Sequence, residues 1–400
     1  MKFLRKFLDK HSRLYEKGGK LHFFEPLFDT VDNFLFTSGK VANNPSFVRD
    51  ALNLKRMMMM VVYALIPAVI FAFYNTGLQA NIEMAKIGKT ALDGWRGGVI
   101  SFLGIGYDQA GIFSDIIIGM LFFLPVYFVS FAVGAFWEIL FGIVRRHEVS
   151  EGFLVTSLLF PMILPPNIPL WQVALGISFG IVIGKEVFGG VGMNIVNPAL
   201  AGRAFLFFAY PAQISGNAVW VAIDGVTKAT PLSKFAEVFP QPDISWSKAF
   251  FGTIPGSMGE TSTLAILIGA LILIITGIGS WRIMVSVFAG MAGTSLLFNM
   301  IGSSTNPMFS LPPYWHLVLG GFAFGMVFMA TDPVSAAMTR RGKYFYGLLI
   351  GILVVMVRVV NPAFPEGMML AILFANVFAP IIDRIIINKN IKRRLLRNGG

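Results

Sequence analysis

The stretch IFSDIIIGMLFFLPVYFVSFAVGAFWEILFGIV, residues 112–144, decides the fold class of this chain. About twenty apolar helical residues cross a bilayer core, and this run is longer than that. The whole composition agrees, because 55% of the 400 residues are hydrophobic and only 13% are charged, where soluble domains are about a quarter charged. The sequence therefore predicts an all-α polytopic membrane protein, and it excludes an ordinary soluble enzyme and a disordered chain.

Nine further apolar segments flank that run, which makes about ten predicted membrane spans. Several are short and interrupted by Gly or Pro, as in the broken or half helices of permease-like proteins. The predicted spans cover residues 57–74, 112–144, 152–164, 169–188, 198–210, 261–279, 283–302, 315–330, 344–360 and 365–382. They divide the chain into an amphipathic N-terminal region (1–56), a first membrane half (57–210), a polar loop (211–258), a second membrane half (259–386) and a basic tail (387–400).

The positive charge gathers in the two tails. Residues 1–56 carry eleven Lys or Arg against six Asp or Glu, and residues 383–400 carry six against one. By the positive-inside rule both termini are predicted to be cytoplasmic and residues 211–258 periplasmic, in a bacterial inner membrane. Because these charges flank apolar spans, they favour lipid headgroups as partners, and no nucleic acid is expected. The chain has no Cys, which excludes disulfides, thiolate metal sites and iron–sulfur clusters of its own.

Two internal echoes suggest a repeat. Asn197-Pro198-Ala199 recurs as Asn361-Pro362-Ala363, and the threading of the spans gives the two copies opposite directions. This pattern favours a five-plus-five inverted repeat, with Asn capping and Pro opening each helix. The segment 156–160 recurs at 294–298 in the same direction. Since the two echoes disagree, the sequence alone leaves the repeat symmetry open.

Four stretches of the chain resemble one family. They are GKEVFGG (184–190), NPALAGRAF (197–205), ATDPVSA (330–336) and RVVNPAFPEG (358–367). These stretches are similar to the B-subunit family of the bacterial Na+-translocating NADH:quinone oxidoreductase, and the resemblance runs from about residue 52 to residue 394. The D-subunit family of the Rnf ion-pumping complex is a sibling with the same architecture.

The resemblance implies a redox subunit of a six-subunit complex. Such a subunit passes electrons from a partner's FMN through covalent FMN and non-covalent riboflavin to a quinone, either ubiquinone or menaquinone, with outward Na+ movement. A flavin transferase is an implied partner for maturation. NADH oxidation is expected on another subunit, because no glycine-rich dinucleotide fingerprint follows a strand in this chain.

In that family a Thr closing a Ser/Thr-Gly-Ala-Thr motif carries FMN through a phosphoester bond. The matching residue is Thr230, with Asp224, Gly225, Thr227 and Ala229 as the other motif residues. Lys228 departs from the small residue that is usual at its position, which puts access of the flavin transferase in question. Without the resemblance, Asp-Gly and Thr-Pro indicate only a turn and a loop.

The remaining candidate sites lie at polar residues in or near the spans, where ionisable groups are costly and point to function. Asn194, Asn197 and Arg203 are predicted riboflavin ligands; the alternative is that Asn197 only caps a helix and Arg203 only neutralises a neighbour. The candidate quinone region is Gly134, Ala135, Phe136 and Glu138; the alternative is a Gly-rich helix-packing face. Asp332 and Asp383 are predicted to lie on the Na+ path, with a surface Asp beside Arg384 as the alternative for Asp383. Lys185, Glu186, Arg358 and Glu366 are expected to form buried structural pairs.

A second function remains open at this level. The two Asn-Pro-Ala boxes also resemble those of aquaporins, and broken-helix repeats suit urea or ammonium permeases, so a channel or permease without redox chemistry is the alternative. Thr230 separates the two hypotheses, because a permease does not need a flavin-attachment motif.

Overall fold

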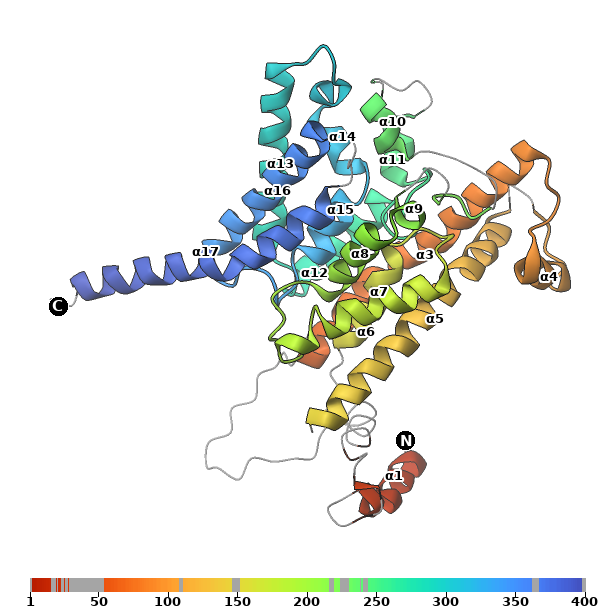
Figure 1. The fold of residues 1–400 in the computed structure, drawn as a ribbon, viewed down its shortest axis with the longest axis horizontal. Helices are drawn as coiled ribbons and strands as arrows, with labels where there is room; N and C mark the ends of the chain where they lie inside the picture. The colour runs from red at the N-terminus through yellow and green to blue at the C-terminus, as the bar shows by residue number, and fades with distance from the viewer. Residues whose placement is uncertain are drawn as a thin grey trace.

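The computed structural model describes most of the membrane region. The described residues are 2–15, 19, 21–22, 25, 28, 54–107, 111–145, 152–215, 219–223, 230–237, 239, 244–361 and 367–397. All the regular elements in these ranges are helices (Figure 1), which confirms the all-α prediction. At the N-terminus α1 (Lys2–Tyr15) is helical, with Leu8 buried between the exposed Arg5 and Asp9.

Six of the described helical segments are long and apolar enough to cross a membrane. They are α3 (Leu54–Ile87), α5 (Ile112–Arg145), α7 (Leu170–Val182) with the following turn η2 (Glu186–Phe188), α13 (Trp281–Ile301), α16 (Gly342–Val360) and α17 (Met368–Arg397). Each lies on a predicted span, and the bounds of α3, α5, α16 and α17 include residues beyond the predicted ones.

The other four predicted spans are short or divided. The helices α6 (Gly152–Met162), α8 (Pro198–Ala209) and α12 (Thr263–Ile275) have 11, 12 and 13 residues. At 1.5 Å per residue they reach roughly 16–20 Å, less than the bilayer core of about 30 Å. The fourth segment is broken into α14 (Pro313–Val318), α15 (Phe322–Phe324) and the π-helical turn η4 (Gly325–Met329). The predicted half-helix architecture is therefore present.

Hydrogen bonds and an ion pair identify the two ends of the helix bundle. We call the first end, which includes the loop that carries Thr230, the Thr230 end. There Asn167 Nδ2, next to the start of α7, donates to Val221 O at 2.6 Å. At the same end Asn306 Nδ2 donates to Val359 O, at the end of α16, at 2.7 Å. At the opposite end, the Asp383 end, Arg145 pairs with Glu186 just after α7, and Asp383 accepts from the backbone N of Thr339 before α16. The two long helices α7 and α16 therefore run in opposite directions.

The same relation holds along both membrane halves (Figure 1). The first half has the order α3, α5, α6, α7, α8, and the second has α12, α13, the broken segment, α16, α17, with each element reversed. Asn197 precedes α8 and Asn361 precedes the segment that leads to α17, so the Asn-Pro-Ala echo marks equivalent elements. Residues 156–160 lie in α6 but 294–298 lie in α13, which are not equivalent. The structure thus favours the inverted repeat.

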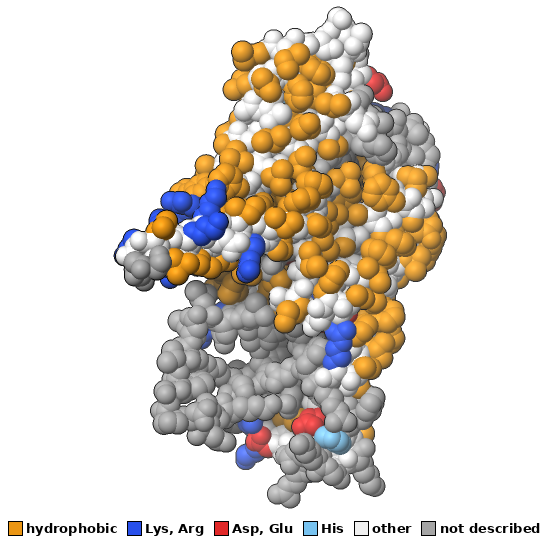
Figure 2. Space-filling model, turned by 60° about the vertical axis from the view of Figure 1, so that its left-hand side comes forward, with side chains coloured by type: hydrophobic (Ala, Val, Ile, Leu, Met, Phe, Trp, Pro, Cys, Tyr) orange, Lys and Arg blue, Asp and Glu red, His pale blue; other side chains and the backbone are white. Residues whose placement is uncertain are grey.

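The outer surface of the bundle is apolar. Figure 2 shows hydrophobic side chains spread over one face, with Lys and Arg side chains gathered at the projecting end of the molecule. Large exposed residues such as Ile70, Phe128 and Val285 belong to this surface, which suits lipid contact. The cations at the end of α17 include Lys392, Arg393, Arg394 and Arg397.

Two short helices lie over the Thr230 end. They are α10 (Pro231–Glu237) and α11 (Trp246–Phe251), both in the predicted loop 211–258. Trp246 Nε1 donates to Tyr314 O at 3.1 Å, which ties α11 to the start of the broken segment. The short elements α4 (Gly94–Phe102), α9 (Pro211–Ile214) and η3 (Pro307–Ser310) also belong to loops between the spans. The polar loops thus cover this end of the bundle.

Candidate functional site

Thr230 stands directly before α10. Its Oγ1 accepts from the backbone N of Ser233 at 3.3 Å and lies 3.0 Å from Ser233 Oγ. The side chain is partly buried. The other motif residues, Asp224, Gly225, Thr227, Lys228 and Ala229, lie outside the described residues. The loop and turn predicted from Asp-Gly and Thr-Pro are therefore described only at Thr230 and the helix that follows.

Thr230 lines one small hollow, and a larger recess lies next to that hollow. The first has a volume of about 30 Å³ and is lined by Thr230, Ser257, Glu260 and Thr261 among others, which is the space of about one water molecule. The second is a recess of about 330 Å³ that shares Pro231, Ile254 and Pro255 with the first. Ligand pockets usually measure about 300–1,000 Å³. By volume, a ring-sized group therefore fits the recess and not the small hollow.

At the Asp383 end, one cavity brings together three predicted site residues. Asn194, Asn197 and Asp332 all line it, with Thr156 and Lys185 among their neighbours. Two of the three predicted riboflavin ligands and a predicted Na+ ligand thus meet although Asp332 is far from both asparagines in sequence. This inner cavity has a volume of about 70 Å³.

Asn197 caps α8, as the sequence allows. Its Oδ1 accepts from the backbone N of Ala199 at 3.0 Å and of Leu200 at 3.3 Å. The first turn of α8 lies against α7, because a Cβ on Gly180 would be 2.3 Å from Pro198 O and only Gly permits this approach. Asn194 Nδ2 donates to Val196 O at 3.0 Å. Both amides are therefore fixed by local backbone groups at the cavity wall.

Asp332 lies just after the π-helical turn η4. Its Oδ1 accepts from the backbone N of Val334 at 3.1 Å, and its Oδ2 accepts from Ser335 Oγ at 2.8 Å. Thr331 Oγ1 donates to Val327 O at 2.5 Å within the irregular turn. Single π-turns occur frequently at functional sites. The site has one carboxylate at the cavity wall, and carboxylate oxygens are ligands that hard cations prefer.

The inner cavity fits a small ion better than a flavin ring in this conformation. About 70 Å³ holds two waters or a partly hydrated cation, whereas a drug-sized ligand needs roughly 300 Å³ or more. The two amides can satisfy the polar edge of an isoalloxazine ring. The cavity, however, is smaller than such a ring requires.

Arg203 lies apart from the two asparagines. Its Nη1 is 3.5 Å from Glu260 Oε1, and the two side chains are only 5% and 9% exposed. Glu260 lines the small hollow beside Thr230. Arg203 therefore belongs to the Thr230 half of the molecule, where it neutralises a buried carboxylate.

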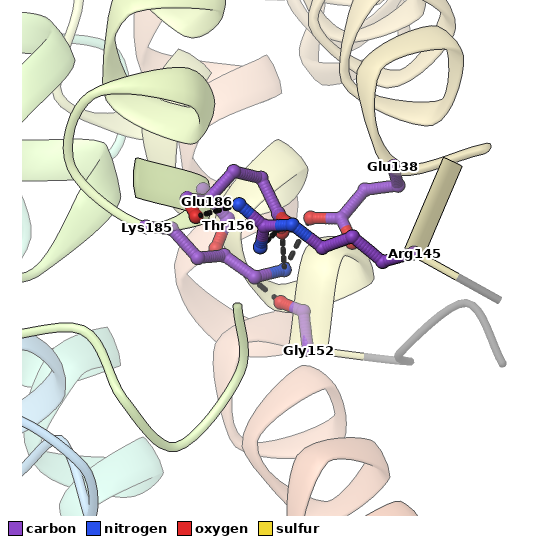
Figure 3. A network of polar contacts seen from close by, with 6 residues as sticks. All are labelled: Glu138, Arg145, Gly152, Thr156, Lys185 and Glu186. Carbon is purple, nitrogen blue, oxygen red and sulfur yellow. Dashed lines mark hydrogen bonds and ion pairs between the residues drawn. The ribbon is translucent and has the colours of Figure 1, made fainter. Parts of the chain in front are cut away.

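Glu138 belongs to a buried ionic network (Figure 3). Its Oε1 accepts from Lys185 Nζ, which also lies 3.8 Å from Glu186 Oε1. Glu186 Oε2 is 3.2 Å from Arg145 Nη1, and Arg145 Nη2 donates to Glu186 O at 2.7 Å. Two carboxylates thus face two cations at the junction of α5 and the turn after α7. The pairing of Glu138 with Lys185 was not predicted. The only sequence feature that the two residues share is that each is an ionisable residue within an apolar stretch.

The other quinone candidates point in different directions. A Cβ on Gly134 would be 3.1 Å from Ile181 Cδ1, so Gly134 faces α7 at a helix contact. Phe136 is 57% exposed on the outer surface, while Ala135 is partly buried. Glu138 alone of the four enters the network.

Asp383 anchors a turn. Its Oδ2 accepts from the backbone N of Met338 at 2.7 Å, and its Oδ1 accepts from the backbone N of Thr339 at 3.0 Å and from Thr339 Oγ1. Arg358 is fully buried and donates to His316 O and Leu319 O, both at 2.9 Å, where α14 ends. Arg358 thus satisfies carbonyls of a broken helix; Glu366 lies outside the described residues.

Comparisons with known proteins agree with this architecture. The profile of the NQR2, RnfD, RnfE family matches residues 41–392. The B-subunit of the Na(+)-translocating NADH-quinone reductase of Ectopseudomonas mendocina (strain ymp) is 59% identical over 401 residues, which cover 99% of each chain. The protein of the same name from Chromohalobacter salexigens is 58% identical over 400 residues, covering 99% of this chain and 97% of the relative. That of Pseudomonas aeruginosa (strain LESB58) is 56% identical over 402 residues, covering 99% of this chain and all of the relative. This multi-pass membrane chain therefore belongs to the NQR2, RnfD, RnfE family.

Proposed function

We propose that the chain is the membrane B-subunit of a Na+-translocating NADH:quinone oxidoreductase. It passes electrons from a partner's FMN through FMN on Thr230 and through riboflavin to ubiquinone or menaquinone, coupled to outward Na+ movement. The observation that carries this proposal is Thr230 itself, which lines the small hollow and is followed by Pro231, a residue that lines both this hollow and the recess of about 330 Å³. The names of relatives up to 59% identical over the full length support it.

The flavin carried by Thr230 supplies reversible electron uptake and release. The chain provides the hydroxyl that bears it, held beside α10 by Ser233. The adjoining recess provides the space. NADH is oxidised on another subunit of the six-subunit complex, and a periplasmic flavin transferase loads Thr230.

The Asp383 end holds the remaining proposed sites. Asn194 and Asn197 bind riboflavin in a widened form of the inner cavity, and Asp332 offers a carboxylate to Na+ on the same wall. Asp383 lies further along the Na+ path. The quinone binds near the segment 134–138, where Glu138 belongs to the ionic network.

The proposed orientation follows from the charges. Arg145, Arg282, Arg340, Arg341 and the cations of α17 all lie towards the Asp383 end or in segments that lead to it. The positive-inside rule then makes this end cytoplasmic and the Thr230 end periplasmic in a bacterial inner membrane. The basic tail contacts lipid headgroups.

A permease without redox chemistry is the second candidate. Half helices and the inverted order of the two membrane halves are typical of secondary transporters, and both occur here. The fold suits both functions, so the decision rests on chemistry at Thr230.

The deciding experiment is flavin attachment. The full-length chain is co-expressed with a periplasmic flavin transferase, denatured, and tested for in-gel flavin fluorescence, and the adduct is mapped by mass spectrometry. We expect a flavin phosphate on Thr230, its loss in Thr230→Ala with normal membrane insertion, and its retention in Thr276→Ala. Thr276 is a matched control because its Oγ1 only donates to carbonyls within α12, to Ile272 O at 2.8 Å and to Leu273 O at 3.2 Å. If the transferase modifies a control substrate but forms no adduct on this chain, the result favours the permease function.

A further inference from the structure

We propose that the recess lined by Lys86, Lys234 and Lys248 seats the flavin ring carried by Thr230, and that its ammonium groups set the redox potential of that ring. The inference deepens the proposed function and rests on it. It assigns a role to three lysines that the sequence motifs leave without one.

Position is the first argument. Thr230 lines the small hollow, and its neighbour Pro231 lines both that hollow and the recess, together with Ile254 and Pro255. Lys234 is one helical turn beyond Thr230, and its backbone N donates to Thr230 O at 3.1 Å. The recess and the hollow beside Thr230 therefore share one wall, and a group on a flexible tether from Thr230 Oγ1 has to extend past this wall to enter the recess.

Volume is the second argument. The recess measures about 330 Å³ and the small hollow about 30 Å³. Only the recess falls in the range of about 300–1,000 Å³ that ligand pockets have. Its apolar wall includes Ile82 and Ile244, which suit the faces of a flat ring, while Gln79 and Thr253 offer hydrogen-bonding groups for the ring edge.

The convergence of the three lysines is the third argument. Lys86 comes from the last turn of α3, where Gln79, Ile82 and Lys86 share one helix face. Lys234 comes from α10 and Lys248 from α11. Three elements distant in sequence thus each contribute one lysine to the lining of the same recess.

The charge balance of the recess is positive. Lys86 Nζ lies 2.9 Å from Glu83 Oε1, so this carboxylate offsets one ammonium group. Lys248 has no carboxylate within ion-pair distance among the residues that the structure describes, and its side chain is exposed. Lys248 therefore presents positive charge to whatever occupies the recess, while Glu83 offsets that of Lys86.

That charge acts on the reduced ring more than on the oxidised one. A flavin ring gains electrons on reduction and concentrates negative charge along its N1–C2=O edge, and charge placed near this edge tunes the cofactor. The ammonium groups stabilise the added negative charge and so raise the midpoint potential. They also offset the negative charge of the phosphodiester at Thr230.

The test is a potentiometric titration of the covalent flavin in the full-length, loaded chain. The signal is the difference spectrum against Thr230→Ala, which removes the covalent flavin alone. We expect each of the variants Lys86→Gln, Lys234→Gln and Lys248→Gln to lower the midpoint potential of the covalent flavin. At a fixed applied potential, the ratio of reduced to oxidised flavin therefore falls. A shift of about tenfold equals a midpoint roughly 30 mV lower for a two-electron couple.

Two controls match these variants. Lys248→Arg keeps the charge and should keep the wild-type potential. Lys89→Gln removes a lysine just beyond α3 that pairs with Asp93 at 2.7 Å and does not line the recess, so it should also leave the potential unchanged.

A second measurement uses the wild-type chain and needs no variant. Raising KCl from about 0.01 M to about 1 M shortens the Debye length from roughly 30 Å to roughly 3 Å, so the midpoint potential should fall as the lysines are screened. If flavin is present on Thr230 but its midpoint potential responds neither to the lysine variants nor to salt, the proposal that the recess seats the ring is refuted. Absence of flavin from wild-type Thr230 refutes the proposed function instead.

Discussion

Asp332 is a single residue on which the proposed coupling to Na+ can be tested. Asp332→Asn keeps an acceptor oxygen for the backbone N of Val334, places an amide donor beside Ser335 Oγ, which can rotate to accept from it, and removes the negative charge beside the inner cavity. We expect the Na+ concentration for half-maximal quinone reduction by the complex to rise about tenfold, which corresponds to about 1.4 kcal/mol of lost cation binding. Asp93→Asn, whose carboxylate pairs with Lys89 at 2.7 Å, is the control. An unchanged Na+ dependence would remove Asp332 from the pathway.

Glu138 tests both a buried network and the quinone site. Glu138→Gln leaves Lys185 with Glu186 at 3.8 Å as its remaining carboxylate within ion-pair distance among the described residues. Breaking a buried pair costs about 3–5 kcal/mol, so the melting temperature should fall. The double variant Glu138→Gln with Lys185→Met should recover part of this loss, because it leaves Glu186 paired with Arg145.

The functional readout of Glu138→Gln is kinetic. If the quinone binds near this residue, quinone reduction slows while upstream flavin reduction keeps its rate in rapid-mixing experiments. Slower flavin reduction with normal quinone reduction would move the quinone site to another part of the chain.

At the scale of the elements, close helix packing depends on single glycines. A Cβ on Gly290 of α13 would be 2.7 Å from Leu348 O of α16, whereas a Cβ on Gly293 of the same helix meets nothing within 4 Å. We expect Gly290→Ala to destabilise by about 1–3 kcal/mol through overpacking. Gly293→Ala should be neutral or stabilise by up to about 1 kcal/mol through helix propensity. Thermal unfolding of the purified chain compares the two, and equal melting temperatures would contradict this contact.

The half helices also show how their polar ends are satisfied. Asn197 caps the start of α8, and the buried Arg358 donates to carbonyls at the end of α14. Backbone groups left unpaired in a bilayer cost several kcal/mol each. Polar side chains at these breaks therefore have a structural task as well as any role in binding.

At the scale of the whole molecule, the proposed orientation can be tested by thiol labelling, because the chain has no Cys. Ser303 is exposed at the Thr230 end, and Leu396 is 80% exposed near the end of α17. In intact spheroplasts Ser303→Cys should react with a membrane-impermeant maleimide, and Leu396→Cys should react only after permeabilisation. The reverse labelling pattern would show that the chain has the opposite orientation in the membrane.

Much of the fold was predictable from the sequence because hydropathy is a local property. The span predicted at 344–360 became α16 (Gly342–Val360), and the segments 152–164 and 198–210 became half helices where Gly and Pro interrupt them. Asn197 was predicted to cap a helix, and it caps α8. These features depend on residues that are neighbours in the chain, so the amino-acid sequence is enough to predict them.

The sites were less predictable because they join distant segments. Asn197 and Asp332 meet at one cavity, and Lys86, Lys234 and Lys248 at one recess, although nothing in their local sequence connects them. The repeat symmetry was open for the same reason, since two echoes gave opposite answers. The helix directions decide between them.

The sequence by itself determined the membrane class, the ten segments and the sides on which charge gathers, because transfer of apolar and charged groups into lipid is set residue by residue. The tertiary structure alone decided that six of the helical segments it describes are long enough to cross, that Glu138 pairs with Lys185, and that Arg203 pairs with Glu260. Those outcomes depend on how helices pack, because a buried charge is stable only where a partner from another segment reaches it.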